Sequence, residues 1–187
     1  MSEIPLSTVT GQPITHAELV KALAKTGEKV IADLTPQSAH LFHMASCVMG
    51  EVAELIEGIL LDKGSDNLLE EAGDIEFYVQ GIRQEFDLKY SAAFIPDIRK
   101  KDPLPWAVIH AGHVFDKIKQ ISMYVKPLDT LGLVQALNAL SYELVKVYNM
   151  YGFTRNQALH ANIIKLSKRY TKMTFSNEAA QARADKT

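Results

Sequence analysis

The sequence has one cysteine, almost no excess of charge and no long apolar run. Cys47 alone excludes a disulfide within the chain. Twenty lysines and arginines stand against 22 acidic residues, and the resulting net charge of -2 gives no basic field that would attract nucleic acid or an anionic membrane. No stretch approaches the roughly 18 apolar residues of a spanning helix. We therefore expect neither nucleic acid nor membrane as a partner.

The opening stretch, MSEIPLSTVTGQPITHAELV, lacks the charged and apolar regions of a secretory signal. This absence favours a cytoplasmic location. The chain has 187 residues, of which 47% are hydrophobic, enough to build one compact domain with a buried core.

Apolar residues recur at helical spacing along most of the chain, and no convincing alternation of period two is present. The pattern predicts an all-α fold. Thr15 with Glu18 has the spacing of a capping box, and Thr35 before Pro36 is typical of a helix start. DKGSDN is a turn signal. The predicted helices cover about 15–32, about 36–61, about 68–86 and a region that begins near 106.

Two acidic pairs with i,i+3 spacing, Glu51/Glu54 and Glu71/Asp74, flank the DKGSDN turn. A turn this short makes its two helices antiparallel neighbours, so the four carboxylates should converge on one seam. Projected at 100° per residue, each pair lies beside a stripe of core positions. The predicted core positions are Leu41, Val48, Val52, Leu55 and Ile59 on the first helix of the pair, and Leu68, Ala72, Ile75, Val79 and Ile82 on the second.

Most acidic pairs in helices are simply solvated. These four repel one another, and no lysine or arginine lies four residues further on to relieve the repulsion. A hard cation would neutralise them, and ligation by oxygen alone suits Mg²⁺ or Mn²⁺. The spacing therefore predicts a divalent-metal site.

The stretch 43–86, with GEVAELIEG and LLEEAGDIEFYVQGIRQ, resembles the MazG-like all-α nucleoside triphosphate pyrophosphohydrolases. The stretch 162–186, NIIKLSKRYTKMTFSNEAAQARADK, is similar to the tail that follows the catalytic helices in MazG-like proteins of the phage type. The resemblance implies a helical bundle that hydrolyses a nucleoside triphosphate to the monophosphate and pyrophosphate. It also implies that Mg²⁺, or Mn²⁺, is bound by the four acids Glu51, Glu54, Glu71 and Asp74. One of these, or Glu70 beside them, would accept the proton of the attacking water.

A triphosphate also needs cationic contacts near its oxygens. Lys165, Lys168 and Arg169 lie near the end of the last predicted helix, with Asn162 one turn earlier. A solvated basic helix end, favourable against the macrodipole, explains the same residues without a ligand. The resemblance favours substrate contacts. His43 is a candidate for contact with the base or sugar, although a lone helical histidine is more often packed or solvated.

The sequence also contains an internal repeat. GHVFDKI at 112–118 parallels GEVAELI at 50–56, an offset of 62 residues, and QALHANIIK at 157–165 parallels AAFIPDIRK at 92–100, an offset of 65. Amphipathic helices can converge on such similarity without duplication. The repeat predicts a catalytic helix pair over about 36–86, a degenerate second pair over about 106–151 and a C-terminal helix and tail over about 154–187.

The second copy has lost the acids of the first. At the offsets of the repeat, His113 and Asp116 replace the first acidic pair, and Ala136 and Ala139 replace the second. We expect the two pairs to form an intrachain pseudo-dimer, a four-helix bundle with a single metal site. The sequence leaves further homodimerisation open.

Three functions stay open at the level of sequence. The first is a pyrophosphohydrolase for NTPs or dNTPs in general. The second is a narrower dUTP or dCTP pyrophosphatase, because the acidic motif handles phosphates and does not distinguish bases. The third is a non-catalytic helical module that binds nucleotides or a partner.

Overall fold

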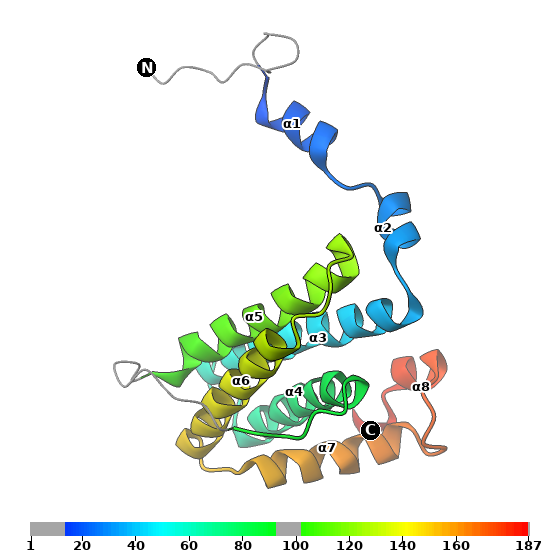
Figure 1. The fold of residues 1–187 in the computed structure, drawn as a ribbon. Coiled ribbons are helices and arrows are strands. Elements are labelled where there is room, and N and C mark those ends of the chain that lie inside the picture. The colour runs from blue at the N-terminus through cyan, green and yellow to red at the C-terminus, as the bar shows by residue number, and fades with distance from the viewer. Residues whose placement is uncertain (1–13, 93–101, 187) are drawn as a thin grey trace.

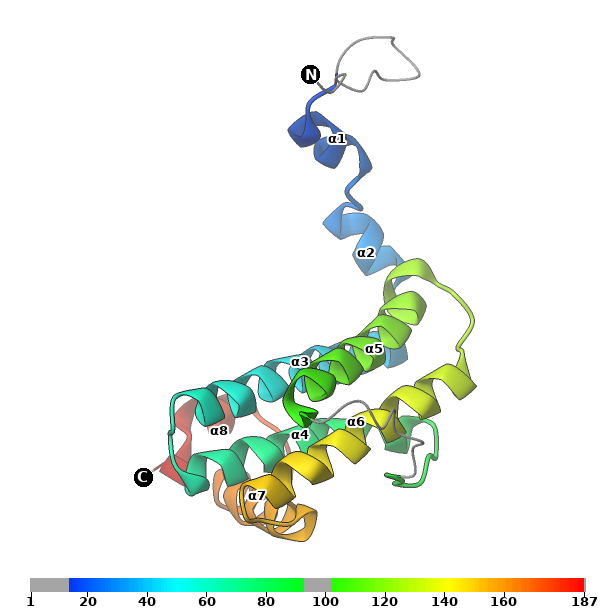
Figure 2. The ribbon, with the colours of Figure 1, turned by 90° about the vertical axis from the view of Figure 1, so that its left-hand side faces the viewer.

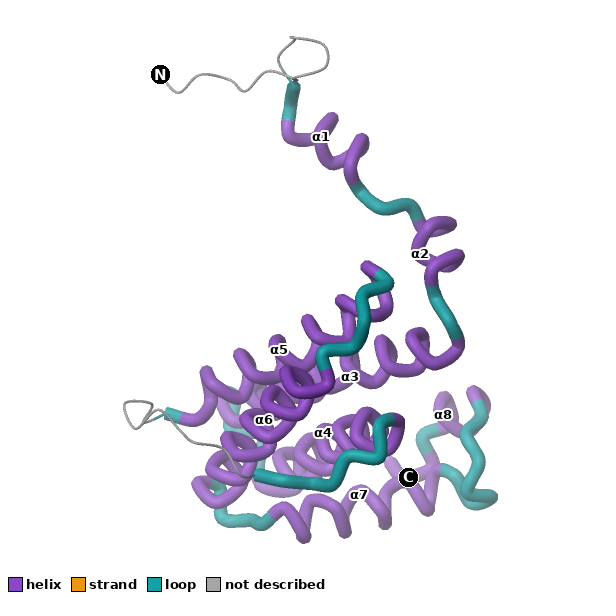
Figure 3. The backbone as a smooth tube through the Cα atoms, in the orientation of Figure 1, coloured by secondary structure: helices purple, strands orange, loops and turns teal. Residues whose placement is uncertain are grey.

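The computed structural model describes residues 14–92 and 102–186. Every regular element in these ranges is helical and no strand occurs among them, which confirms the predicted all-α bundle (Figure 3). No described helix has the length and apolar character needed to cross a membrane. The elements are α1 (His16–Leu23), α2 (Gly27–Asp33), α3 (Pro36–Leu60), α4 (Ser65–Glu85), α5 (Pro103–Tyr124), α6 (Thr130–Met150), α7 (Arg155–Arg169), α8 (Asn177–Ala182) and the 3₁₀ helix η1 (Ala184–Lys186).

Two helical hairpins, α3–α4 and α5–α6, make up the bundle (Figures 1 and 2). Helix α3 packs against both α4 and α5, and α7 lies along α4. A single apolar core runs through both hairpins. Nine of the ten predicted core positions are buried, and Ile59 is partly buried against them. The helical periodicity of the sequence therefore located the core of the first hairpin.

The first predicted helix, about 15–32, is divided in the structure. Thr15 caps α1 with the predicted capping box, but the chain becomes extended at Ala24. The side chain of Thr26 then accepts a hydrogen bond from the backbone N–H of Lys29 and starts α2. Neither short helix contains a buried residue, and together they extend away from the bundle (Figure 1). Because no core contacts stabilise one continuous helix here, the cap at Thr26 starts a separate helix.

The two hairpins share the register that the repeat predicts. Helices α4 and α6 both have 21 residues and are offset by 65 at both ends. Seven of the eight buried positions of α4 correspond to buried positions of α6 at that offset. Of the segment 92–100 used to define the repeat, residues 93–100 lie outside the described ranges.

The same offset recurs where the two helices end. Asp87 and Gly152 both have positive φ, 50° and 81°, just after the last helical turn. The residue that follows each donates a backbone hydrogen bond back into its helix, Leu88 to Arg83 at 2.8 Å and Phe153 to Tyr148 at 3.1 Å. Both hairpins therefore end in the same left-handed cap, at positions that match at the offset of 65.

A buried ion pair fixes the start of α7 against α4. The side chain of Glu76 is 2% exposed, and its Oε2 accepts a hydrogen bond from Arg155 Nε at 2.8 Å. The hydroxyl of Tyr148 lies 3.5 Å from its other oxygen. Burial raises the pKa of Glu76, and the charge of Arg155 opposes that shift. This contact sets the start of α7, whose C-terminal turns carry the predicted substrate ligands.

The paired caps allow a test of backbone strain. No atom lies within 4 Å of a Cβ placed at Gly152, so the cost of Gly152→Ala comes from its positive φ alone. We expect this change to lower the free energy of unfolding by about 1–2 kcal/mol. Asp87→Gly should leave it unchanged or raise it, because glycine relieves the same strain. Urea unfolding at equilibrium measures both, and a loss of stability in Asp87→Gly would contradict the shared cap.

Candidate functional site

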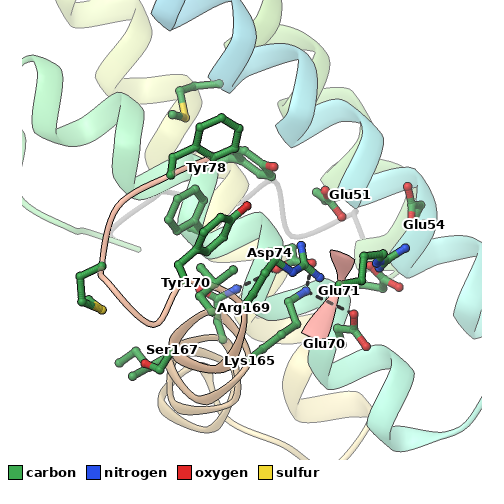
Figure 4. Close-up of a pocket in the computed structure, with 18 of the residues that line it drawn as sticks. Glu51, Glu54, Glu70, Glu71, Asp74, Tyr78, Lys165, Ser167, Arg169 and Tyr170 are labelled. Atoms are coloured by element: carbon green, nitrogen blue, oxygen red, sulfur yellow. Dashed lines mark hydrogen bonds and ion pairs between the residues drawn. The ribbon is translucent and has the colours of Figure 1, made fainter. Parts of the chain in front are cut away.

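Helices α3, α4 and α7, together with the chain after α7, enclose a cavity of about 910 Å³. Nine of the ten predicted site residues line this cavity. Lys168 does not, and it is exposed. In Figure 4 the acidic residues lie on one side, Tyr78 and Tyr170 lie on the other, and Lys165 and Arg169 lie between them. The structure therefore gathers residues from both ends of the sequence around one space.

Three of the four predicted metal ligands come together in the cavity. Glu51, Glu71 and Asp74 each offer a carboxylate oxygen, and these oxygens lie within 4.8 Å of one another. Glu54 lines the same cavity but is exposed at its edge. The antiparallel α3–α4 hairpin produces this convergence, because positions three residues apart on each helix face the seam between them.

Lys165 supplies positive charge to the carboxylates. Its Nζ makes a short ion pair with Asp74 and lies 3.2 Å from Glu70 Oε1. Only 12% of this lysine side chain is exposed. The repulsion between the acids is thus relieved by a residue from α7, roughly ninety positions further along the chain. The sequence shows no basic residue close to the acids, so it did not indicate that Lys165 would pair with them.

Asn162 binds the other carboxylate oxygen of the same aspartate. Its Nδ2 donates to Asp74 Oδ1 at 2.7 Å, and the residue is 7% exposed. Asp74 therefore holds two of the residues that the resemblance assigns to the triphosphate, Asn162 and Lys165. In this arrangement the acids and the predicted phosphate ligands form one connected cluster.

Gly73 permits the close approach that forms this cluster. A Cβ at this position would lie 2.8 Å from the carbonyl oxygen of Ala158 and 2.8 Å from Asn162 Cβ. Helix α7 can therefore lie against α4 only where α4 has no side chain. The sequence LLEEAGD contains this glycine, but its packing role depends on a helix that the motif does not include.

The crowding of the acids changes their protonation. Burial, and then repulsion from Asp74, Glu54 and Glu71, raises the pKa of Glu51 from 4.5 to about 7. The pKa of Glu71 is also raised, mainly by burial. Such shifts mark a site where negative charge has collected in a partly dry environment.

These residues fit a divalent cation of the hard type. The donors are carboxylate oxygens, with no sulfur and no imidazole among the three that converge. The cluster carries more negative charge than Lys165 neutralises, and Glu51 responds with its raised pKa. A cation with open coordination positions would relieve this repulsion and would face the rest of the cavity.

Arg169, the third predicted substrate ligand in α7, is bound to the C-terminal segment. Its Nε and Nη2 donate to the two carboxylate oxygens of Asp185 at 2.6 and 2.7 Å. Only 14% of this arginine side chain and 2% of the aspartate side chain are exposed. The pairing lowers the pKa of Asp185 to about 2 and raises the pKa of Arg169. The sequence did not indicate this partner.

Aromatic rings line another part of the same cavity. His43 lines it and packs edge-on against Tyr78, with ring centroids 6.1 Å apart. The chain after α7 contributes Tyr170 and Phe175, whose rings lie 5.8 Å apart. The sequence analysis missed these two, since short aromatic segments in a tail carry no periodic signal.

The matching surface of the second hairpin has a different character. A cavity of about 500 Å³ there includes His113, Ala136 and Ala139, three of the four positions that correspond to the acids. Asp116, the fourth, is paired with Lys119 at 2.8 Å and does not line the cavity. The described residues hold no second cluster of three or more possible metal ligands.

No family model matches the chain, and neither the curated proteins nor the solved structures contain a match to it.

A test of the helix contact follows from Gly73. We expect Gly73→Ala to push α7 away from α4 and to lower the free energy of unfolding by about 1–3 kcal/mol. Gly50→Ala is the matched control beside the same acids, because no atom lies within 4 Å of its new methyl group. It should raise stability by up to about 1 kcal/mol through helix propensity. Chemical unfolding measures both, and equal stability of Gly73→Ala and the unchanged protein would contradict the contact.

The raised pKa of Glu51 predicts the pH dependence of stability without metal. Between pH 4.5 and about 7 the folded chain holds a proton that the unfolded chain has released, so the free energy of unfolding should fall as pH rises through this window. Glu51→Gln should make the fall shallower. Glu57→Gln, at an exposed position of the same helix, should not change it. Thermal unfolding in chelator across this range tests both, and identical slopes would refute the assignment.

Proposed function

We propose that the protein is a MazG-like, Mg²⁺-dependent nucleoside triphosphate pyrophosphohydrolase. The reaction adds one water to the α-phosphorus and releases a nucleoside monophosphate and pyrophosphate. The observation that carries the proposal is the placement of Glu51, Glu71 and Asp74 in one cavity with Lys165 and with an aromatic surface. A nucleoside triphosphate has parts that match these two surfaces. Its phosphates bind cations, and its flat base can stack on aromatic rings.

The acids of the hairpin provide the binding site for the cation. Glu51, Glu71 and Asp74 would hold Mg²⁺ or Mn²⁺, with Glu54 at the edge as a fourth ligand. When bound, such a cation supplies positive charge against phosphate oxygens and acidifies water. The chain places these ligands on two packed helices, so their separation is fixed before the substrate arrives.

The remaining polar residues bind and orient the substrate. Lys165 and Asn162 carry N–H donors at the border between the acids and the rest of the cavity, where phosphate oxygens would lie. Glu70, 3.2 Å from Lys165, and the neighbouring carboxylates form the group that takes the proton from water. The partly enclosed walls limit access of bulk water and so strengthen these interactions.

The test is pyrophosphate release over a panel of NTPs and dNTPs, with and without Mg²⁺. Asp74→Asn keeps the size of the side chain and removes its charge, so we expect turnover to fall by at least about a hundredfold. Asp116→Asn and His113→Gln, at matching positions of the second hairpin, should stay within a few-fold of the unchanged protein. Loss of turnover in these controls would show that both hairpins contribute to one site.

Metal binding is measured separately from turnover. Mg²⁺ at hundreds of times its dissociation constant should stabilise the folded chain by roughly 2–4 kcal/mol, and Asp74→Asn should remove most of that gain. Stabilisation by Mg²⁺ and nucleotide without pyrophosphate release would identify a binding module instead. Release from dUTP or dCTP alone would identify the narrower pyrophosphatase.

A further inference from the structure

The chain from Tyr170 to Asp185, which we call the C-terminal loop, forms one wall of the cavity. It leaves α7, turns at Met173, where φ is 51°, contains the short helix α8 and returns to α7 at η1. Tyr170, Met173 and Phe175 line the cavity from this side. The Arg169–Asp185 ion pair joins the two ends of the loop.

The apolar surface of this wall is largely uncovered. Phe175 is 70% exposed and Met173 is 83% exposed, although both line the cavity. On the opposite wall Phe77 is 46% exposed and packs edge-on against Tyr78, with centroids 5.2 Å apart. Exposed aromatic side chains from two elements that line one cavity are typical of a site for a flat apolar ligand.

The position of these walls identifies the occupant. Figure 4 labels Tyr78 and Tyr170 from these walls, and both lie on the other side of Lys165 and Arg169 from Glu51, Glu54 and Glu71. With a cation bound to the acids, a ligand that spans the cavity would be anionic at one end and planar at the other. A nucleotide satisfies both conditions, since every base presents a π-face on which aromatic side chains can stack.

We propose that the C-terminal loop is the nucleobase wall of this site, and that the Arg169–Asp185 ion pair holds the wall in place. This inference rests on the proposed function for the phosphate end of the ligand. It gives Arg169 a different role from the one the resemblance implies. Two of its nitrogens are committed to Asp185, so Arg169 is a positioning residue for the loop.

The first experiment separates base from phosphate. Binding of α,β-imido nucleoside triphosphates and of inorganic tripolyphosphate, both with Mg²⁺, is measured by calorimetry on the full chain. Phe175→Leu keeps an apolar side chain and removes the ring, so nucleotide affinity should fall by about tenfold while tripolyphosphate affinity is unchanged. Tyr151→Leu changes an exposed aromatic residue outside the cavity and should affect neither ligand. Equal loss for both ligands in Phe175→Leu, or no loss, overturns the proposal.

The second experiment tests the Arg169–Asp185 ion pair by whether substitution of each partner weakens or strengthens ligand binding. If Arg169 positions the loop, Asp185→Asn and Arg169→Lys should both weaken nucleotide binding and both leave tripolyphosphate binding unchanged. If Arg169 instead binds phosphate directly, Asp185→Asn frees it and strengthens tripolyphosphate binding, whereas Arg169→Lys weakens it. That opposite pattern overturns the positioning role. Circular dichroism of each variant checks that the helix content of the whole chain is unchanged.

Failure of this inference is distinguishable from failure of the proposed function. Nucleosides, which have no phosphate, probe the wall alone, and weaker nucleoside binding in Phe175→Leu supports the wall even if no pyrophosphate is released. If all variants release pyrophosphate and their affinities do not depend on the base, the proposed function is supported and the role of the C-terminal loop as a nucleobase wall is overturned. If Phe175→Leu only abolishes self-association, measured by analytical ultracentrifugation, the surface contacts a second copy and the proposal is overturned.

Discussion

Repulsion between carboxylates is the constraint around which this fold is arranged. Glu51, Glu71 and Asp74 point into the same space from two packed helices, and burial adds to the cost of their charge. The folded chain meets that cost by placing Lys165 among them. For this lysine to reach the acids, α7 must lie directly against α4, and α4 accordingly has a glycine at the point of contact. Charge in the site thus dictates backbone packing beside it.

The hairpin without these acids has a complementary role. Helices α5 and α6 supply much of the buried core, including the fully buried Leu133, Leu137 and Leu140. The second hairpin buries a carboxylate as well, Glu143 on α6, which pairs with Lys146 at 3.0 Å. The first hairpin therefore carries the three carboxylates that converge, and the second contributes apolar burial that stabilises the whole bundle.

The sequence predicted those features that depend on local physics. The caps at Thr35 and Thr15, the core positions of α3 and α4 and the convergence of acids on their seam all follow from helical periodicity and turn chemistry. Thr26 is a possible helix cap in the sequence and could have indicated that the first helix is divided there. The amphipathic pattern continues on both sides of Thr26, and for that reason one continuous helix was predicted. The roles of Gly73 and Asp185 were not readable, because each depends on a partner brought close only by tertiary packing.

Both hairpins belong to one chain, so the contacts between them are intramolecular. The buried hydroxyl of Ser122 on α5 donates to the carbonyl of Ser38 on α3 at 2.8 Å, a contact that in a two-chain bundle would be intermolecular. Here it forms in a unimolecular step. Dilution, which separates the subunits of a dimer, leaves this interface unaffected. A substitution also appears in one half only, whereas in a symmetric dimer each one appears twice. The two halves of the bundle can therefore change independently while they share one core.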